Sequence, residues 1–286
     1  MITVNGRAKI NLTLDILGRR ADGYHEVEMI MQSVALHDTV ELTKIPAGIE
    51  LHINVPWLKA DSSNLAWRAA ALMQEEFGLK EGVALRLTKR IPVAAGLAGG
   101  STDAAAVLRG MVELFSLDVS TERLCELGAR LGSDIPFTLL GGTMLASGRG
   151  EQLTRLADFP TTYVVLAKPH LSVSTAWAYQ TYDRAPAIAH PDNVKMRAAI
   201  ARGNRQEAAS LLCNVLESVT ITKYPVIKVL KEKMKQAGAL ASMMSGSGPT
   251  VFALAEDEAA AERIAAAVRQ SDVDVFITQT TSAEME

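Results

Sequence analysis

The chain of 286 residues has few cysteines and no long apolar segment, and both shortages narrow the class of protein. Its two cysteines, Cys125 and Cys213, lie far apart within apolar patterns that are typical of helices. The sequence therefore predicts two reduced thiols rather than a disulfide or a metal pair. No apolar run approaches the ~18 residues of a membrane-spanning helix. The first twenty residues alternate between apolar and polar types, without the apolar centre of a signal peptide, so we expect a cytoplasmic protein with no membrane partner.

Blocks of basic residues are lacking as well. Lysine and arginine number 29 against 32 acidic residues, for a formal net charge of −3, and they are scattered singly or in short pairs. This pattern argues against a nucleic-acid partner. A hydrophobic content of 48% with 21% charged residues is the balance of a globular protein, and the length allows one large domain or two ordinary ones.

The pattern of strands and helices changes about halfway along the chain. In the first half, alternating apolar residues predict strands such as "AKINLTLDIL", and one helix is expected between an N-cap at Ser63 or Asn64 and Gly78. The second half ends in a strand, turn, strand, helix and strand, a pattern that predicts a ferredoxin-like sandwich. We therefore expect an α/β (α+β) fold with two domains, over residues 1–156 and 157–286. The other expected helices span about 101–115, 121–131, 174–182, 192–201, 205–217 and 224–237.

The stretch "PVAAGLAGGSTDAAAVL", residues 92–108, places Gly96, Gly99 and Gly100 just before an alanine-rich helix that we expect to begin near Ser101. Glycine allows a positive φ and a close approach of the backbone to a ligand. A helix N-terminus adds unpaired N–H groups and a positive dipole end, so phosphate is the usual ligand of such a loop. No Gly-Lys-Ser/Thr follows, so this is not a Walker A loop, and it does not match G-x-G-x-x-G. A tight structural turn is the alternative.

Three further positions have both a functional and a structural interpretation. The stretch "MSGSGPTVFAL", residues 244–254, is a second glycine-rich turn, which a simple hairpin also explains. Asp134 in "LGSDIPF" is either a functional acid or a residue of a cap or turn. Lys9 in "RAKINLTL" is either functional or a solvent-facing residue of an edge strand.

Together these motifs resemble the GHMP kinase superfamily. "PVAAGLAGGSTDAAA" is similar to its phosphate-binding loop, and "SGSGPTVFAL" to its C-terminal glycine motif. "AKINLTLDILGRRADGYHEVEMIMQSVALHD" and "GSDIPF" further resemble the branch whose members phosphorylate 4-diphosphocytidyl-2-C-methyl-D-erythritol, in isoprenoid precursor synthesis. The motifs occur in the family's order, so the resemblance covers essentially the whole chain.

The resemblance implies a two-domain GHMP-kinase fold that binds ATP and Mg²⁺ and transfers a phosphoryl group to the 2-hydroxyl of that small-molecule substrate. Lys9 and Asp134 match the two catalytic residues at the acceptor. Asp134 would serve either as general base or as an orienting charge, because a neighbouring ammonium lowers the pKa of a carboxyl group. The residues that would bind ATP are Pro92, Val93, Ala94, Ala95, Gly96, Leu97, Ala98, Gly99, Gly100, Ser101 and Thr102.

The resemblance also implies a substrate site. Asn11 would hold the substrate, Tyr24 and His25 would contact its cytosine ring, and Tyr179 would cover that ring, although Trp177 and Tyr182 are close in the sequence. Consecutive strand residues face opposite ways, so a turn at Asp22–Gly23 is needed to aim Tyr24 and His25 at one ligand. No protein ligand for the metal is identified.

The loop departs from the family pattern at Ala98 and Thr102. An alanine with positive φ costs on the order of 1 kcal/mol, so we predict a negative φ for Ala98. Two alternative functions remain at this stage. One is another GHMP kinase, acting on mevalonate, a sugar or homoserine, and the other is a non-catalytic nucleotide-binding module. The segment "DGYHEV" favours the cytidine-linked substrate, because tyrosine and histidine suit a flat heteroaromatic ring.

Overall fold

The computed structural model describes residues 1–183 and 189–283, which form two compact units. The first unit consists of Met1–Ala8, Leu36–Val93 and Ala98–Leu140, and the second of Lys9–Ala35, Ala94–Leu97 and the chain from Gly141 onward. The long strands β1 (Ile2–Arg19) and β2 (His25–Ile45) contribute residues to both units. A single boundary at residue 156 stays a prediction, since the compact units are assembled from separate segments of the chain.

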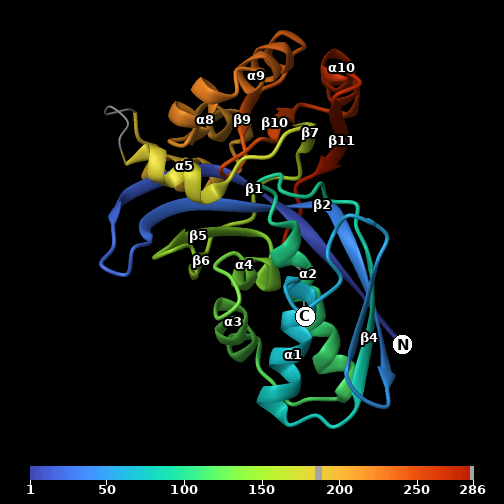
Figure 1. Cartoon of the computed structure of the whole chain (residues 1–286). Helices are drawn as coiled ribbons and strands as arrows, with labels where there is room; N and C mark the ends of the chain where they lie inside the picture. Colours follow the sequence, from blue (N-terminus) through green and yellow to red (C-terminus); the bar gives the residue numbers. More distant parts are fainter. Residues whose placement is uncertain (184–188, 284–286) are drawn as a thin grey trace. The chain divides into compact units, whose positions relative to one another are not determined.

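The first unit places helices against a small sheet. β4 pairs antiparallel with residues 39–45 of β2 and parallel with β3, and α1 and α2 lie side by side (Figure 1). Asn64 caps α1 and Gly78, with a φ of 59°, ends it, as expected. The helix α4 was not expected from the sequence. The elements are β3 (Ile49–Ile53), α1 (Leu65–Phe77), β4 (Gly82–Thr88), α2 (Gly99–Phe115), α3 (Thr121–Ala129) and α4 (Ile135–Leu140).

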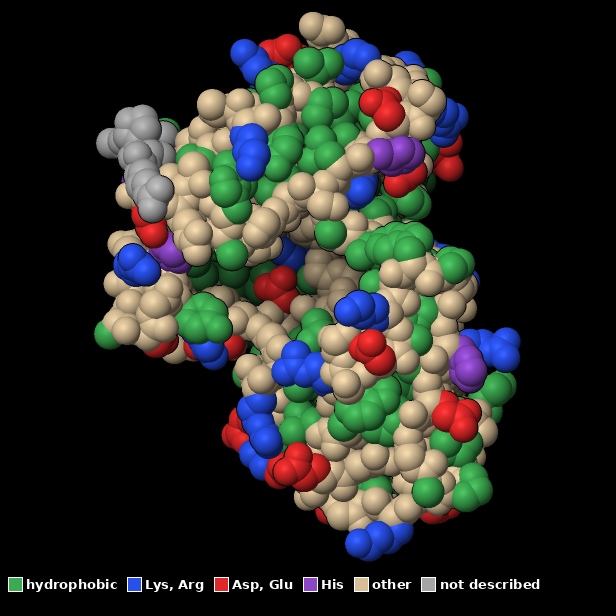
Figure 2. Space-filling view, viewed as in Figure 1, with side chains coloured by type: hydrophobic (Ala, Val, Ile, Leu, Met, Phe, Trp, Pro, Cys, Tyr) green, Lys and Arg blue, Asp and Glu red, His purple; other side chains and the backbone are tan. Residues whose placement is uncertain are grey.

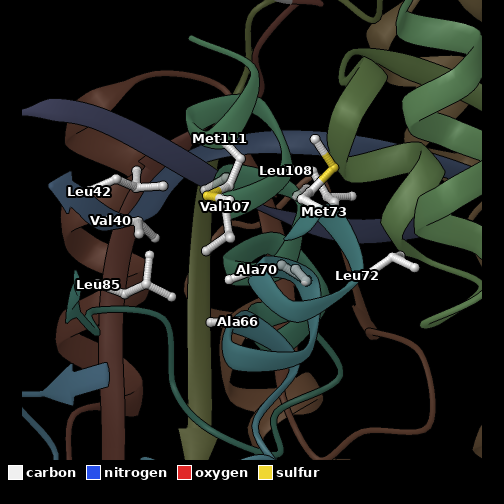
Figure 3. Packing of buried hydrophobic residues seen from close by; sticks show 14 of the residues in the cluster. Val40, Leu42, Ala66, Ala70, Leu72, Met73, Leu85, Val107, Leu108 and Met111 are labelled. Atoms are coloured by element: carbon white, nitrogen blue, oxygen red, sulfur yellow. The ribbon is translucent and has the colours of Figure 1, made fainter. Parts of the chain in front are cut away.

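The core of the first unit explains the alanine-rich sequence of α2. Small side chains on α1 and α2 let the two helices approach closely, and the strands supply the larger residues Val40, Leu42 and Leu85 (Figure 3). A Cβ at Gly110, in the middle of α2, would lie 2.4 Å from Leu42 Cδ1. Gly110 therefore lets the fully buried Leu42 pack against the helix backbone.

The second unit contains the expected ferredoxin-like sandwich. Four antiparallel strands lie in the order β11-β7-β10-β9, and α9 and α10 pack on this sheet. The chain order of these elements is the split βαβ pattern that the sequence predicts. The elements are β7 (Tyr163–Pro169), α9 (Val226–Gln236), β9 (Ala241–Met244), β10 (Val251–Ala255), α10 (Glu258–Val268) and β11 (Val273–Gln279).

The remaining elements of the second unit correct one expectation. The helix predicted over 205–217 is wrong beyond residue 210, because the chain forms a two-residue strand, β8, that pairs parallel with β1. Cys213 therefore lies in a strand and not in a helix, although both cysteines are free thiols, as expected. The elements are β5 (Thr143–Ser147), β6 (Gln152–Arg155), α5 (Thr175–Tyr182), α6 (Asn193–Ala201), α7 (Arg205–Ser210), β8 (Cys213–Asn214) and α8 (Glu217–Lys223).

Neither a membrane-spanning helix nor, on the face drawn in Figure 2, a basic patch is present among the described residues. No helix among residues 1–183 and 189–283 is long and apolar enough to span a membrane. On the face drawn in Figure 2, basic and acidic side chains are intermixed. That face therefore carries no continuous basic surface among the residues described.

Candidate active site

The glycine-rich loop has the backbone conformation of an anion-binding nest. Positive φ values recur at every second residue, with 53° at Ala94, 76° at Gly96 and 60° at Ala98. Alternation between left-handed and other conformations turns successive N–H groups to one side of the chain, where they can surround an anion. The loop continues directly into the N-terminus of α2, which adds further N–H groups. The loop is therefore suited to bind phosphate, as its sequence predicts.

The prediction of a negative φ for Ala98 is wrong. Ala98 is the N-cap residue of α2, and its carbonyl oxygen accepts a hydrogen bond from Thr102 N at 2.9 Å. The chain must turn from the loop into the helix at this residue, and the left-handed conformation makes that turn. An L-residue in this conformation costs about 1–2 kcal/mol.

The three glycines of the loop have different roles. Of Gly96, Gly99 and Gly100, only Gly96 has a positive φ, because α2 begins at Gly99, two residues earlier than expected. A Cβ at Gly96 would lie 2.2 Å from the carbonyl oxygen of Ser245. A Cβ at Gly99 would lie 3.3 Å from Lys89 Nζ, whereas Gly100 has room for a methyl group. Close packing therefore requires Gly96 and favours Gly99.

The second glycine-rich turn connects β9 and β10, so its interpretation as a hairpin is confirmed. It also packs against the first half of the glycine-rich loop, at Gly96. Ser245 Oγ donates a hydrogen bond to the carbonyl oxygen of Gly96 at 2.9 Å, and Gly246 has a φ of 56°. The Gly248–Pro249 peptide bond is cis. The turn thus holds residue 96 of the loop in place.

Asn214 supports this turn, and the sequence analysis missed it. The Asn214 side chain is buried, and its Nδ2 donates hydrogen bonds to the carbonyl oxygens of Met244 and Gly246, both at 2.8 Å. Its Oδ1 accepts a hydrogen bond from Leu216 N. These bonds hold the residues around Asn214 outside a helix, whereas α7 already ends at Ser210. An asparagine in an apolar pattern is the only sequence signal of this role.

Lys9 and Asn11 lie buried on β1, beside the first half of the loop. Their exposed fractions are 5% and 0%, and Lys9 Nζ donates to Asn11 Oδ1 at 2.7 Å. Lys9 N also donates to the carbonyl oxygen of Leu97 at 3.2 Å. The interpretation of Lys9 as a solvent-facing edge residue is therefore excluded. A buried ammonium beside a loop with the conformation of an anion-binding nest is placed to stabilise negative charge.

Asp134 lies beside the start of α2 in the first unit. It is half-buried directly before α4, and its carbonyl oxygen accepts a hydrogen bond from Thr138 N at 3.1 Å. Thr138 Oγ1 is 3.4 Å from the carbonyl oxygen of Ser101, and a Cβ at Gly132 would lie 4.0 Å from Ser101 Oγ. The segment that carries Asp134 therefore flanks Ser101. Lys9 and Asp134 belong to different units, so their joint action at the acceptor stays a prediction.

Two aromatic contacts follow the turn at Gly23, whose φ is 86°. The rings of His25 and Tyr179 lie 5.1 Å apart, and His25 Nε2 is 2.7 Å from Asp183 Oδ1. Tyr24 is 55% exposed, and the guanidinium of Arg149 lies 4.9 Å from the centre of its ring. Asp183 and Arg149 were not recognised from the sequence, because their partners are distant along the chain.

Tyr179 is distinguished from the neighbouring aromatic residues by its contacts. The ring of Trp177 instead meets Tyr224 edge-on at 6.0 Å, with Lys223 Nζ 4.1 Å from its centre. Burial raises the pKa of Tyr182, with Asp15 adding to the rise. Of the three candidates, Tyr179 is the one with a ring contact to His25.

The described acidic residues do not form a cluster that could hold a metal ion by itself. Among residues 1–183 and 189–283, no group of three or more His, Cys, Asp or Glu side chains could hold a metal. Mg²⁺ is often bound by one or two protein groups together with substrate phosphates.

Thr102, the second position at which the loop departs from the family pattern, has a structural contact. Its hydroxyl donates a hydrogen bond to the carbonyl oxygen of Arg7 at 2.7 Å, which anchors α2 to β1.

The glycine-rich loop, the second glycine-rich turn and the ferredoxin-like sandwich are together typical of a GHMP kinase. A family model described as "GHMP kinases N terminal domain" matches residues 64–142, and one described as "GHMP kinases C terminal" matches residues 196–274. A 4-diphosphocytidyl-2-C-methyl-D-erythritol kinase of Acetivibrio thermocellus is 47% identical over 279 residues, which cover 98% of this chain and 99% of the relative. The chain belongs to the 4-diphosphocytidyl-2-C-methyl-D-erythritol kinase family within the GHMP kinases.

Solved structures agree with this family. A crystal structure of 4-(cytidine 5'-diphospho)-2C-methyl-D-erythritol kinase matches with a TM-score of 0.83 at 34% identity, over 98% of this chain and 99% of the other. Homoserine kinase from Cytophaga hutchinsonii matches with a TM-score of 0.77 at 19% identity, over 99% and 95% of the two chains. The second likeness shows the fold alone.

Proposed function

We propose that this protein transfers the γ-phosphoryl group of ATP to the 2-hydroxyl of 4-diphosphocytidyl-2-C-methyl-D-erythritol, a step in isoprenoid precursor synthesis. The aromatic contact between His25 and Tyr179 carries the proposal, because a tilted pair of rings with a polar partner at Asp183 suits a nucleobase. The names of the relatives over their full length point to the same substrate. The cytoplasmic location expected from the sequence stays a prediction.

The phosphate loop binds the nucleotide in this proposal. N–H groups from Ala94 to Ser101 would surround the phosphates, and Mg²⁺ bound with ATP would supply charge neutralisation there. We name no protein ligand for the metal. Since the transition state of phosphoryl transfer is loose, catalysis depends mainly on positioning the reactants and stabilising charge.

Lys9 and Asp134 act at the acceptor in this proposal. The acceptor hydroxyl oxygen forms the new bond to the γ-phosphorus, and the bond from that phosphorus to the bridging oxygen of ADP breaks with its electrons. The hydroxyl proton passes to Asp134, while the buried ammonium of Lys9 stabilises the charge that develops on the acceptor oxygen. Asn11, hydrogen-bonded to Lys9, orients that ammonium.

Tyr24, His25 and Tyr179 bind the cytosine in this proposal. Stacking on an aromatic ring contributes about 1–3 kcal/mol per base, and the hydrogen bond between His25 and Asp183 fixes the orientation of the imidazole. A phosphoryl acceptor without the cytidine diphosphate would lose these contacts.

An ADP-release assay across an acceptor panel tests the proposal. The panel comprises the diphosphocytidyl substrate, methylerythritol without the cytidine diphosphate, mevalonate and homoserine, each with ATP and Mg²⁺. Of these four acceptors, we expect only the diphosphocytidyl substrate to give rapid ADP release. Comparable kcat/KM for mevalonate or homoserine would assign the protein to another branch of the superfamily. No ADP release with any acceptor, from a protein that binds ATP, would favour a non-catalytic nucleotide-binding module.

A further inference from the structure

A buried ion cluster packs against the first turn of α2. Lys89, which follows β4, binds Asp38 of β2 and Asp103 of α2, and the exposed fraction of each of the three side chains is 4% or less. Lys89 Nζ donates hydrogen bonds to Asp38 Oδ2, to Asp103 Oδ2 at 2.7 Å and to the carbonyl oxygen of Gly99 at 3.4 Å. One ammonium thus connects a strand to two residues one helical turn apart.

The backbone fixes the strand side of this cluster. Asp38 Oδ1 accepts hydrogen bonds from Arg90 N at 2.5 Å and from Ile91 N at 2.8 Å. Asp38 is therefore held by the two residues that lead into the phosphate loop. Since Asp38 is fixed in this way, it also fixes the ammonium of Lys89.

The cluster crowds two buried carboxyl groups onto one ammonium, which argues against a purely stabilising role. Burial raises the pKa of Asp103 well above its usual value, a rise that Lys89 opposes and Asp38 increases. Asp103 Oδ1 is buried and has no hydrogen-bond partner among the described residues. Apolar residues of similar volume often replace buried ion pairs at no cost to stability. The contact with the phosphate loop gives the cluster a different use.

We propose that Lys89 and Asp103 are positioning residues for the phosphates of ATP. They hold Gly99 and the following residues of α2 where the N–H groups of the first turn meet the nucleotide. Such groups bind an anion well only when they are held in position before it arrives. The inference rests on the proposed function, since it takes ATP as the ligand of the loop.

Asp103→Ala tests the inference without leaving an unpaired charge, because Lys89 keeps Asp38 as its partner. Calorimetry with a non-hydrolysable ATP analogue is expected to show a Kd raised about tenfold or more. KM for ATP should rise by a similar factor, while KM for the diphosphocytidyl acceptor stays within about twofold of wild type. A general loosening of the fold would raise both KM values.

Two further substitutions at Asp103 separate positioning from folding. Asp103→Asn keeps an oxygen for Lys89 and is expected to bind the analogue within about threefold of wild type. Asp103→Leu fills the space with an apolar side chain, and serves where Asp103→Ala does not fold. We expect the same loss of ATP affinity for Asp103→Leu as for Asp103→Ala.

A matched control removes a different ion pair of the same unit. Arg123→Met in α3 breaks the pairs with Glu76 and Glu126, which lie outside the cluster, and should leave ATP affinity unchanged. A folded Asp103→Ala or Asp103→Leu variant that binds the analogue within about twofold of wild type would overturn the inference. An Asp103→Asn variant as weak as Asp103→Ala would also overturn it. A wild-type protein that does not bind the analogue would overturn the proposed function, and this inference with it.

Discussion

Substituting alanine at two glycines of the phosphate loop should have opposite effects on stability. Gly96 has a φ of 76°, and a Cβ there would lie 2.2 Å from the carbonyl oxygen of Ser245. Gly100 is helical, and a Cβ there would lie 3.4 Å from Leu65 Cδ1, an ordinary contact. We therefore expect Gly96→Ala to be strongly destabilising and Gly100→Ala to be neutral or stabilising.

The size of the effect at Gly96 follows from three contributions. The left-handed conformation costs an L-residue about 1–2 kcal/mol, and moving backbone atoms out of an overlap costs about 1–3 kcal/mol. The stiffer unfolded chain returns about 0.4–1 kcal/mol. The net loss is about 3 kcal/mol, a large part of the 5–15 kcal/mol by which a folded protein is usually stable. At Gly100, replacing a helical glycine by alanine should gain about 0.5–1 kcal/mol.

Ala98→Gly provides a matched test of the same reasoning with the opposite sign. Relief of the left-handed conformation gains about 1–2 kcal/mol, and the added freedom of the unfolded chain costs about 0.5–1 kcal/mol. A small net stabilisation follows. Urea unfolding followed by circular dichroism measures all three variants. A Gly96→Ala midpoint no lower than that of Gly100→Ala would refute the reasoning.

Three further predictions concern the site and one thiol. Lys9→Ala and Asp134→Asn should each lower kcat by about 10² or more while ATP still binds, and steady-state rates within about threefold of wild type would contradict these roles. Tyr24→Ala should raise KM for the diphosphocytidyl substrate about tenfold with little change in KM for ATP, whereas equal changes in both would contradict base stacking. Burial raises the pKa of Cys125 to about 11. Alkylation of Cys125 at pH 8 should therefore be at least about tenfold slower in the native protein than in urea. Equal rates would show that this thiol is exposed.

Local sequence signals predicted much of the fold. The cap at Ser63 or Asn64, the stop at Gly78 and the ferredoxin-like order of the last elements depend on neighbouring residues, and all three are confirmed, with the cap at Asn64. The prediction of a helix over 205–217 was wrong beyond residue 210. Asn214 lies in a strand there, and its side chain bonds to residues about 30 positions away. Periodicity within a segment cannot show such a partner.

The candidate site likewise has parts that the sequence predicts and parts that only the structure shows. The loop and the glycine turn stand out in the sequence because glycine and turn chemistry are local, whereas Tyr24 and His25 were singled out by the resemblance to the family. The cluster of Lys89, Asp38 and Asp103 joins residues as far as 65 positions apart (103 − 38), so nothing near any of them marks the other two. Lysine in a strand pattern is usually exposed, and only the structure shows that this one is buried.

Ala98 shows how a rule about one residue can give the wrong answer about a loop. The cost of a left-handed alanine, about 1–2 kcal/mol, predicts that the chain would avoid that conformation. The loop has two such alanines, Ala94 and Ala98, on either side of Gly96. A nest needs alternating backbone conformations whatever the side chains are, and the surrounding contacts at Gly96 and Thr102 maintain them. Strain of this kind persists where the rest of the structure determines the geometry, so the two alanines support the phosphate-binding role proposed for this loop.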